Sequence, residues 1–345
     1  MAGLQEVETA LDSRRQLVNG ALSEAVPAVM PERLHGAAQY LLDAGGKRLR
    51  PAILLLAAET LAETSPETEA EYREFPSVGD EPVDLLVAAV SIELVQTFTL
   101  VHDDLIDEDD VRRGVAAVHR EYDRSTALLA GDVLHARAYE VLLETGAPPE
   151  QSMHALARLA HTSSEICDGQ TTDLMLEGRE QVTVDEYLEM IDQKTAVLFA
   201  TAACLPAILL GREEAVDPLA AYGRDVGRAF QIQDDLLDLT APTETLGKQR
   251  GSDLVESKRT LVTVHARQQG VDIDTLVDSE TTADVTDREV DAAVERLEAA
   301  GSLDYARKRA REYVASGKDH LDSLPDNESR ALLAGTADYL VEREY

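Results

Sequence analysis

Residues 94–107 read LVQTFTLVHDDLID, an apolar run that ends in three aspartates. Much later in the chain, residues 229–239 read AFQIQDDLLDL and repeat the same design. Both stretches lack the strict alternation of a half-buried strand, and their apolar residues continue into longer segments with a helical period. The two stretches therefore predict two long apolar helices, each carrying its own aspartate cluster.

The helical period extends over nearly the whole chain, with no sustained alternation of apolar and polar residues, so strands are not expected. Irregular connections are expected at 63–84 and 240–258, and the second is long enough for a lid. We predict an all-α fold in a single domain, residues 1–345. The expected helices cover approximately 4–25, 32–44, 51–63, 82–110, 123–144, 149–178, 183–211, 217–241, 258–269, 286–300, 303–321 and 327–341.

The composition is strongly acidic. A formal net charge of −34 repels nucleic acid and anionic membrane surfaces, so neither is an expected partner. Because high ionic strength screens self-repulsion, this charge combined with 44% hydrophobic residues indicates a protein adapted to high salt. The apolar run 195–210 is broken by Pro206, and the N-terminus has no apolar core. We therefore expect no membrane span, no signal peptide and a cytoplasmic location.

The aspartate clusters indicate a divalent cation. The outer acids of each cluster are four residues apart, where like charges on one helix face repel. Mg²⁺ prefers oxygen ligands and typically takes one or two carboxylates together with substrate phosphates. Two facing clusters are expected to hold about three Mg²⁺ ions, with Mn²⁺ as an alternative, around a leaving diphosphate. The candidate metal ligands are Asp103, Asp104, Asp107, Asp234, Asp235 and Asp238.

A solvated acidic face is the alternative interpretation for one cluster, but two matched copies in apolar helices argue against it. Basic residues also accompany the clusters. GGKRLRP (45–51) is a cationic turn whose glycines allow close approach of a phosphate, although a basic helix end that balances its dipole is the alternative. Arg112 and Arg113 follow the first cluster. The chain has six lysines, and four of them lie in such segments: Lys47, Lys194, Lys248 and Lys258.

Together these segments resemble the trans-isoprenyl diphosphate synthases, which make geranyl, farnesyl and geranylgeranyl diphosphates. The resemblance covers most of the chain, in the family's order. It implies the all-α isoprenoid synthase fold, with helices around a central cavity, and a homodimer. It also implies head-to-tail condensation of isopentenyl diphosphate with dimethylallyl, geranyl or farnesyl diphosphate. The matching segments are GGKRLRP, DDLIDEDDVRRG, FQIQDDLLD, GDVL (131–134), DGQTTDL (168–174), KTA (194–196) and GKQRGSDL (247–254).

The resemblance further implies a role for each motif residue. Metal binding would rest mainly on Asp103, Asp107 and Asp234, and the lid would exclude water. Thr195 and Gln231 would lie beside the nascent allylic cation. Isopentenyl diphosphate would be bound by Lys47, Arg50, Gln96 and Arg113. The allylic diphosphate would be held by Arg112, Lys194, Lys248 and Lys258.

Two residues one turn before the first cluster, Phe98 and Thr99, are predicted to limit product length. An aromatic residue at the fifth position before the DDxxD sequence resembles the archaeal geranylgeranyl type, which implies a C20 product. Farnesyl (C15) and geranylfarnesyl (C25) diphosphates are the alternatives. The acidic composition suggests a halophilic archaeon, whose ether lipids need C20 or C25 chains.

Other functions are less well supported by the sequence. A class I terpene cyclase shares the DDxxD sequence but usually lacks GGKRLRP and has an Asn/Ser/Glu metal motif in place of DDLLD. A non-catalytic subunit of a heteromeric synthase would have lost one aspartate cluster. An acidic metal-binding or scaffold protein is the third alternative. Release of diphosphate that depends on isopentenyl diphosphate would separate all three from the prenyltransferase.

Overall fold

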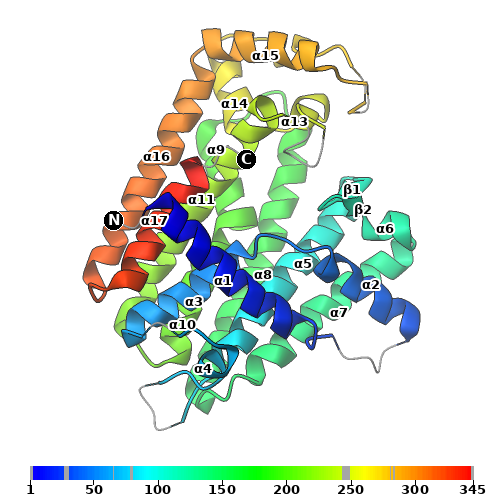
Figure 1. Ribbon diagram of the computed structural model, residues 1–345. Helices are drawn as coiled ribbons and strands as arrows, with labels where there is room; N and C mark the ends of the chain where they lie inside the picture. The colour runs from blue at the N-terminus through cyan, green and yellow to red at the C-terminus, as the bar shows by residue number, and fades with distance from the viewer. Residues whose placement is uncertain are drawn as a thin grey trace. The chain divides into compact units, whose positions relative to one another are not determined.

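The computed structural model describes residues 3–26, 31–64, 66–77, 81–242, 249–279, 281–282 and 284–342. These residues are almost entirely helical (Figure 1), which confirms the all-α prediction. The helices are α1 (Leu4–Leu22), α2 (Glu32–Asp43), α3 (Leu49–Ala62), α4 (Glu69–Arg73), α5 (Leu85–Ile106), α6 (Val118–Glu121), α7 (Arg124–Leu143), α8 (Pro149–Glu177), α9 (Val184–Ile191), α10 (Val197–Leu209), α11 (Val216–Thr240), α13 (Ser252–Val255), α14 (Leu261–Gln268), α15 (Asp287–Ala299), α16 (Ser302–His320) and α17 (Glu328–Glu342).

The helix predicted over 183–211 is observed, but its hydrogen-bonding pattern changes from α-helical to π-helical for one turn. It begins at a capping box, in which the Thr183 hydroxyl accepts from the Glu186 backbone N–H at 3.2 Å. A π-helical turn, η1 (Asp192–Ala196), then separates α9 from α10. Short 3₁₀ turns occur at η2 (Glu213–Ala215), η3 (Ile273–Thr275) and η4 (Leu321–Ser323).

The expectation of no strands is wrong at one place, directly after α5 (Figure 1). Strands β1 (Val111–Arg112) and β2 (Val115–Ala116) pair antiparallel and form the only sheet in the described part of the chain. The two turn residues have φ values of 53° (Arg113) and 77° (Gly114). Two-residue hairpin loops with positive φ at both positions match the twist of their strands, so Arg-Gly serves here where Asn-Gly is more usual.

The chain packs into two compact units, each assembled from several segments. The first unit comprises residues 1–163, 198–223 and 320–336. The second unit comprises residues 164–197, 224–319 and 337–345. The single-domain prediction therefore stays a prediction, and each unit is described by itself.

In the first unit, α5 packs most extensively against α7 and also against α3. Helix α5 is the one described helix long and apolar enough to cross a membrane, but 72% of its apolar window is buried within the protein. Its apolar character is therefore that of a core helix. His102 fills the space over Gly131 of α7, because a Cβ there would lie 2.3 Å from His102 Nε2 and would displace the ring.

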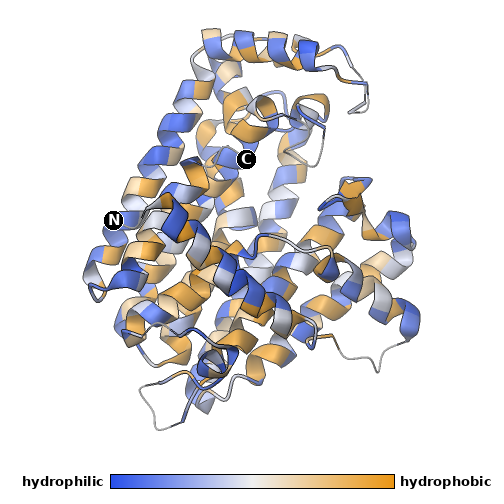
Figure 2. Ribbon diagram, in the orientation of Figure 1, coloured by the Kyte–Doolittle hydropathy of each residue, from blue (hydrophilic) through white to orange (hydrophobic). Residues whose placement is uncertain are grey.

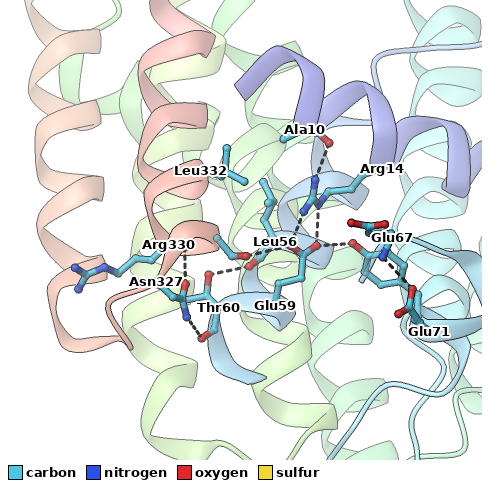
Figure 3. Close-up of polar contacts among 12 residues, drawn as sticks. Ala10, Arg14, Leu56, Glu59, Thr60, Glu67, Glu71, Asn327, Arg330 and Leu332 are labelled. Atoms are coloured by element: carbon cyan, nitrogen blue, oxygen red, sulfur yellow. Dashed lines mark hydrogen bonds and ion pairs between the residues drawn. The ribbon is translucent and has the colours of Figure 1, made fainter. Parts of the chain in front are cut away.

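A buried polar network also lies in the first unit, around Glu59 of α3 (Figure 3). Glu59 is 0% exposed and forms an ion pair with Arg14 of α1, whose Nε donates to Glu59 Oε1 at 2.8 Å. Tyr72 Oη donates to Oε1 at 2.6 Å, and Ser329 Oγ donates to Oε2 at 3.1 Å. One carboxylate thus connects α1, α3, α4 and α17 by hydrogen bonds.

The core of the second unit is formed by apolar residues of α9, α11, α14, α15 and α16, among them Tyr187, Ile232 and Leu261. Figure 2 shows long hydrophilic stretches on α16, whose buried residues include Leu303, Ala306 and Ala310. This alternation of core-facing apolar and outer polar residues is the usual pattern of a surface helix.

Candidate active site

The predicted site residues are divided between the two units. The first unit contains the isopentenyl site residues, the first aspartate cluster and the chain-length residues. The second unit contains Lys194, Thr195, Gln231, Lys258 and the second aspartate cluster. Lys248 lies outside the described residues.

The first aspartate cluster is the C-terminal turn of α5. Asp104 is 1% exposed, and its Oδ1 accepts from Arg112 Nε at 2.6 Å. Arg112 also donates from Nη2 to Asp109 Oδ2 at 2.7 Å. Burial raises the pKa of Asp104 in spite of the opposing effect of Arg112. Asp103 and Asp107 are half-buried instead, so their carboxylates are the more accessible ones.

These residues fit a Mg²⁺ ion that is completed by a substrate. Within the described part of the chain, no three His, Cys, Asp or Glu side chains converge as a ready-made metal cage. Mg²⁺ usually takes few protein carboxylates and fills its other positions with phosphate oxygens and water. Asp104 Oδ2 is buried without a hydrogen-bond partner, so an acceptor oxygen remains in this turn.

The residues of the cationic turn before α3 differ in their exposure to solvent and in their contacts. Gly45 and Gly46 have φ values of 85° and 145°, which a side chain would disfavour. Lys47 is exposed. Arg50 lies in the first turn of α3 with its guanidinium carbon 4.1 Å from the centre of the Phe199 ring. Arg48, which was not predicted as a site residue, is buried.

Arg113 of the hairpin reaches the cationic turn. A Cβ on Gly46 would lie 3.0 Å from the guanidinium carbon of Arg113, so the hairpin and the turn are in close contact. Two of the residues predicted for isopentenyl diphosphate, Lys47 and Arg113, therefore belong to segments that touch. Gln96 is half-buried on α5.

Phe98 lies among other aromatic rings. It is 7% exposed, stacks on His135 of α7 with ring centres 4.4 Å apart, and meets His102 edge-on at 5.0 Å. His135 Nε2 is 2.9 Å from Tyr139 Oη. Thr99 is half-buried, and its hydroxyl donates to the backbone of α5. A ring fixed from two sides can form a firm wall, as a chain-length limit requires.

The three acids of the second aspartate cluster, on α11, differ in their burial and in their hydrogen-bond partners. Asp235 is 6% exposed and accepts from Tyr187 Oη at 2.5 Å and from Gln231 Nε2 at 2.9 Å. Burial, followed by the charge of Asp253, raises the pKa of Asp235 to about 8. Asp234, in contrast, is half-buried.

Asp238 accepts hydrogen bonds from residues inside the 240–258 segment. It is 0% exposed and accepts from Ser252 Oγ at 2.9 Å and from the Asp253 backbone N–H at 3.2 Å. Asp238 therefore stabilises the start of α13. The metal roles predicted for the three acids remain predictions, but the geometry makes Asp234 the most accessible of them.

We predict different results for two neighbouring substitutions on α11. Asp234→Asn should lower kcat by at least about a hundredfold, because it removes an accessible anionic ligand. Asp235→Asn should lower kcat by less than about tenfold, because Asp235 is buried against Tyr187 and Gln231 and an amide oxygen can still accept from Tyr187. Steady-state kinetics of both variants in saturating Mg²⁺ tests this order, and equal losses would contradict it.

Lys194 and Thr195 lie in the π-helical turn η1, a feature often found at functional sites. Lys194 Nζ donates to Asp173 Oδ2 at 2.6 Å, and Thr195 Oγ1 donates to Gln231 Oε1 at 2.9 Å. A Cβ on Gly169 would lie 2.3 Å from the Lys194 backbone nitrogen, so α8 can approach η1 only at a glycine. The structure thus brings Thr195 and Gln231 together, as their predicted shared role requires.

Lys258 follows α13 and is paired with Glu256 at 2.9 Å. Its role stays a prediction, as does the lid over 240–258. Sequence reasoning missed four residues that hold site residues in place, namely Glu93, Asp173, Tyr187 and Ser252. A signal was present for Glu93, which is a lone charge in an apolar run, and for Asp173, which lies inside the DGQTTDL segment.

The Polyprenyl synthetase family matches residues 31–297 of the chain. The chain is 59% identical over 346 residues, 100% of both chains, to the geranylfarnesyl diphosphate synthase of Natronomonas pharaonis. Its fold is similar to that of the geranylgeranyl pyrophosphate synthetase from Geoglobus acetivorans, with a TM-score of 0.84, 40% identity, and coverage of 96% of this chain and 99% of that one. It is also similar to a Caulobacter crescentus polyprenyl synthase complexed with calcium and isoprenyl diphosphate, with a TM-score of 0.83, 30% identity, and coverage of 99% and 98%.

Proposed function

Because this chain belongs to the polyprenyl synthetase family, we propose that it is a Mg²⁺-dependent prenyltransferase that condenses isopentenyl diphosphate head to tail with allylic diphosphates. One observation carries the proposal. Each aspartate cluster contains a buried acid that accepts from a protein donor and at least one half-buried acid whose side chain reaches solvent. Two helices that each offer an accessible acid beside a buried, hydrogen-bonded one support the action of both clusters on one allylic diphosphate.

The cationic side chains act on the diphosphate in this proposal. Arg112, Lys194, Lys248 and Lys258 hold the allylic diphosphate and stabilise its charge as it leaves. Mg²⁺, when bound by the accessible aspartates, neutralises the same developing charge. Asp104 and Asp173 hold two of these cations in fixed positions, through contacts of 2.6 Å to Arg112 and to Lys194.

The carbon framework reacts beside Thr195 and Gln231. The Gln231 amide bridges the Thr195 hydroxyl and the Asp235 carboxylate, which fixes its orientation. Oxygen atoms of this pair, and a backbone carbonyl of the π-helical turn, offset the positive charge of the allylic cation. The C3–C4 double bond of isopentenyl diphosphate attacks the cation and C2 loses a proton. The motifs contain no obvious general base, so we assign the proton to the released diphosphate.

We propose geranylgeranyl diphosphate (C20) as the main product, supported by the buried Phe98 ring against His135. A geranylfarnesyl product (C25) is the second candidate, and the 59% identity to the N. pharaonis synthase favours it. A homodimer in the cytoplasm is also proposed. The adjacent exposed residues Leu128 and Leu129 on α7 support such a partner surface.

The activity is tested with labelled isopentenyl diphosphate and C5, C10 or C15 allylic starters, at low and high KCl, with the products sized. We expect Mg²⁺-dependent elongation that ends at C20 or C25. Diphosphate release without isopentenyl diphosphate would instead indicate a terpene cyclase. No turnover with any starter would contradict the proposal.

Substitution of Phe98 tests the product limit. Phe98→Ala should lengthen the main product by at least one isopentenyl unit, because the ring that faces His135 is lost. The matched control is Phe75→Ala, since Phe75 is a buried ring of the same unit that stacks on Tyr72 rather than on a site residue. Unchanged product length in Phe98→Ala, or equal lengthening in both variants, would show that the limit lies elsewhere.

A further inference from the structure

A buried carboxylate, Glu93, lies in the middle of α5. Its exposure is 2%, and it follows an almost uninterrupted apolar run from Leu85 to Ile92. A charge taken out of water is strongly unfavourable unless it is paired and hydrogen-bonded. Glu93 therefore needs its cationic partners, and these come from the two segments assigned to isopentenyl diphosphate.

The first partner is Arg48 of the cationic turn, whose side chain is 1% exposed. Arg48 has a φ of 49°, so the turn bends sharply there and directs the residue inward. Its guanidinium forms an ion pair with Glu93 and donates to Asn19 Oδ1 at 2.9 Å and to the Leu42 carbonyl at 2.7 Å. Arg48 thus ties the turn to the interior and is too deep to meet a substrate.

The second partner is Arg113 of the β1–β2 hairpin. Its Nη2 donates to Glu93 Oε1 at 3.1 Å, and its Nη1 donates to the Leu41 carbonyl at 3.2 Å. The guanidinium also lies against Gly46, where no side chain is present. Unlike Arg48, Arg113 keeps 17% of its side chain exposed.

We propose that Glu93 is a positioning residue for the isopentenyl diphosphate site. It accepts from both arginines at one oxygen, holds the hairpin against the cationic turn, and fixes the guanidinium of Arg113 where a diphosphate can meet it. The negative charge of Glu93 offsets only one of the two guanidinium charges. One net positive charge therefore remains to attract the substrate. This inference rests on the proposed function, in which Lys47, Arg50 and Arg113 bind isopentenyl diphosphate.

Positioning and simple electrostatics make opposite predictions for Glu93→Gln. Removal of an anion beside a diphosphate site raises the positive potential, so electrostatics alone would lower the KM for isopentenyl diphosphate. Loss of the anchor releases Arg113 and leaves it facing Arg48, so positioning raises that KM. We expect a rise of roughly tenfold or more, with the KM for the allylic substrate changed by less than about twofold.

The matched control is Glu59→Gln, which neutralises another buried glutamate paired with an arginine in the same unit. It should lower stability against urea without a selective change in the KM for isopentenyl diphosphate. Glu93→Asp is measured as well, because it keeps the charge, shortens the reach and should still fold if Glu93→Gln does not. A selective rise in that KM for either Glu93 variant supports the proposal.

An unchanged or lower KM for isopentenyl diphosphate in the folded Glu93 variants would overturn the proposal. Equal rises for both substrates, matched by Glu59→Gln, would also overturn it, because they would indicate general loosening. Arg113→Gln separates this failure from failure of the proposed function. If Arg113→Gln leaves the KM unchanged, the assignment of the isopentenyl site is wrong. If only Arg113→Gln raises it, the site stands and Glu93 does not position it.

Discussion

Asp103→Ala is expected to lower kcat by roughly a thousandfold while the protein remains folded. Asp103 is a half-buried acid in the last turn of α5, next to the buried Asp104 that holds Arg112. In the proposed mechanism its carboxylate would help to hold Mg²⁺, which would neutralise the charge of the departing diphosphate, so its loss should affect the chemical step most. Single-turnover measurements with labelled isopentenyl diphosphate in saturating Mg²⁺ separate this effect from weaker binding.

Asp110→Ala is the matched control for this substitution. Asp110 lies seven residues further on in the same acidic segment and pairs with Arg120 at the surface, where its side chain is 75% exposed. It should retain nearly the wild-type kcat, because it lies outside the DDxxD sequence. Near-normal turnover of Asp103→Ala, or equal losses in both variants, would end the assignment of the first cluster to the metal site.

The secondary structure could be predicted closely because periodicity and local end signals agree. The helix predicted over 149–178 is observed as Pro149–Glu177, and the capping box at Thr183 is present. The π-helical turn in the helix that follows could not be predicted. A π-helical turn contains one extra residue, and a buried helix that is apolar on all sides shows no change in its sequence pattern at that point.

The hairpin at Arg113-Gly114 was missed for a related reason. Two-residue strands are too short to show alternation, and an arginine at the first turn position gives no sequence signal for positive φ. The structural consequence is large, because the hairpin carries Arg113 to the Gly46 turn.

The sequence predicts which residues belong to the candidate site, but it does not predict the different burial and hydrogen-bond partners that these residues have in the structure. All six aspartates look alike in the repeated DDxxD pattern, yet Asp235 contacts Tyr187 and Asp238 contacts Ser252. Those partners are distant in sequence from the cluster, so spacing within a helix could not identify them. In the cationic turn, Arg50 is predicted to bind diphosphate, and nothing in the sequence indicates that Arg48, two residues earlier, is buried.

Arg14→Met is expected to lower the free energy of unfolding by about 3–5 kcal/mol. Arg14 is the ion-pair partner of Glu59 in the network that joins α1, α3, α4 and α17 (Figure 3). Its removal leaves a fully buried carboxylate with only neutral donors, Tyr72 and Ser329. Urea unfolding followed by circular dichroism at several KCl concentrations measures the loss.

The neighbouring Arg15→Met is the matched control, on the same helix but at the surface. Arg15 pairs with Asp12 at 3.1 Å, and the two side chains are 39% and 53% exposed. Exposed pairs contribute at most about 1 kcal/mol and are screened by salt, so this variant should lose little, and less as KCl rises. The loss in Arg14→Met should persist at high KCl, because buried charges are screened much less.

The comparison of these two variants tests which interactions hold α3, the helix that carries Arg50 in its first turn. If Arg14→Met loses several times more than Arg15→Met at every KCl concentration, the buried network stabilises α3 independently of salt. The double variant Arg14→Met/Glu59→Leu should then recover part of the loss, since no buried charge remains unpaired. Equal small losses in both single variants would mean that apolar packing alone fixes α3.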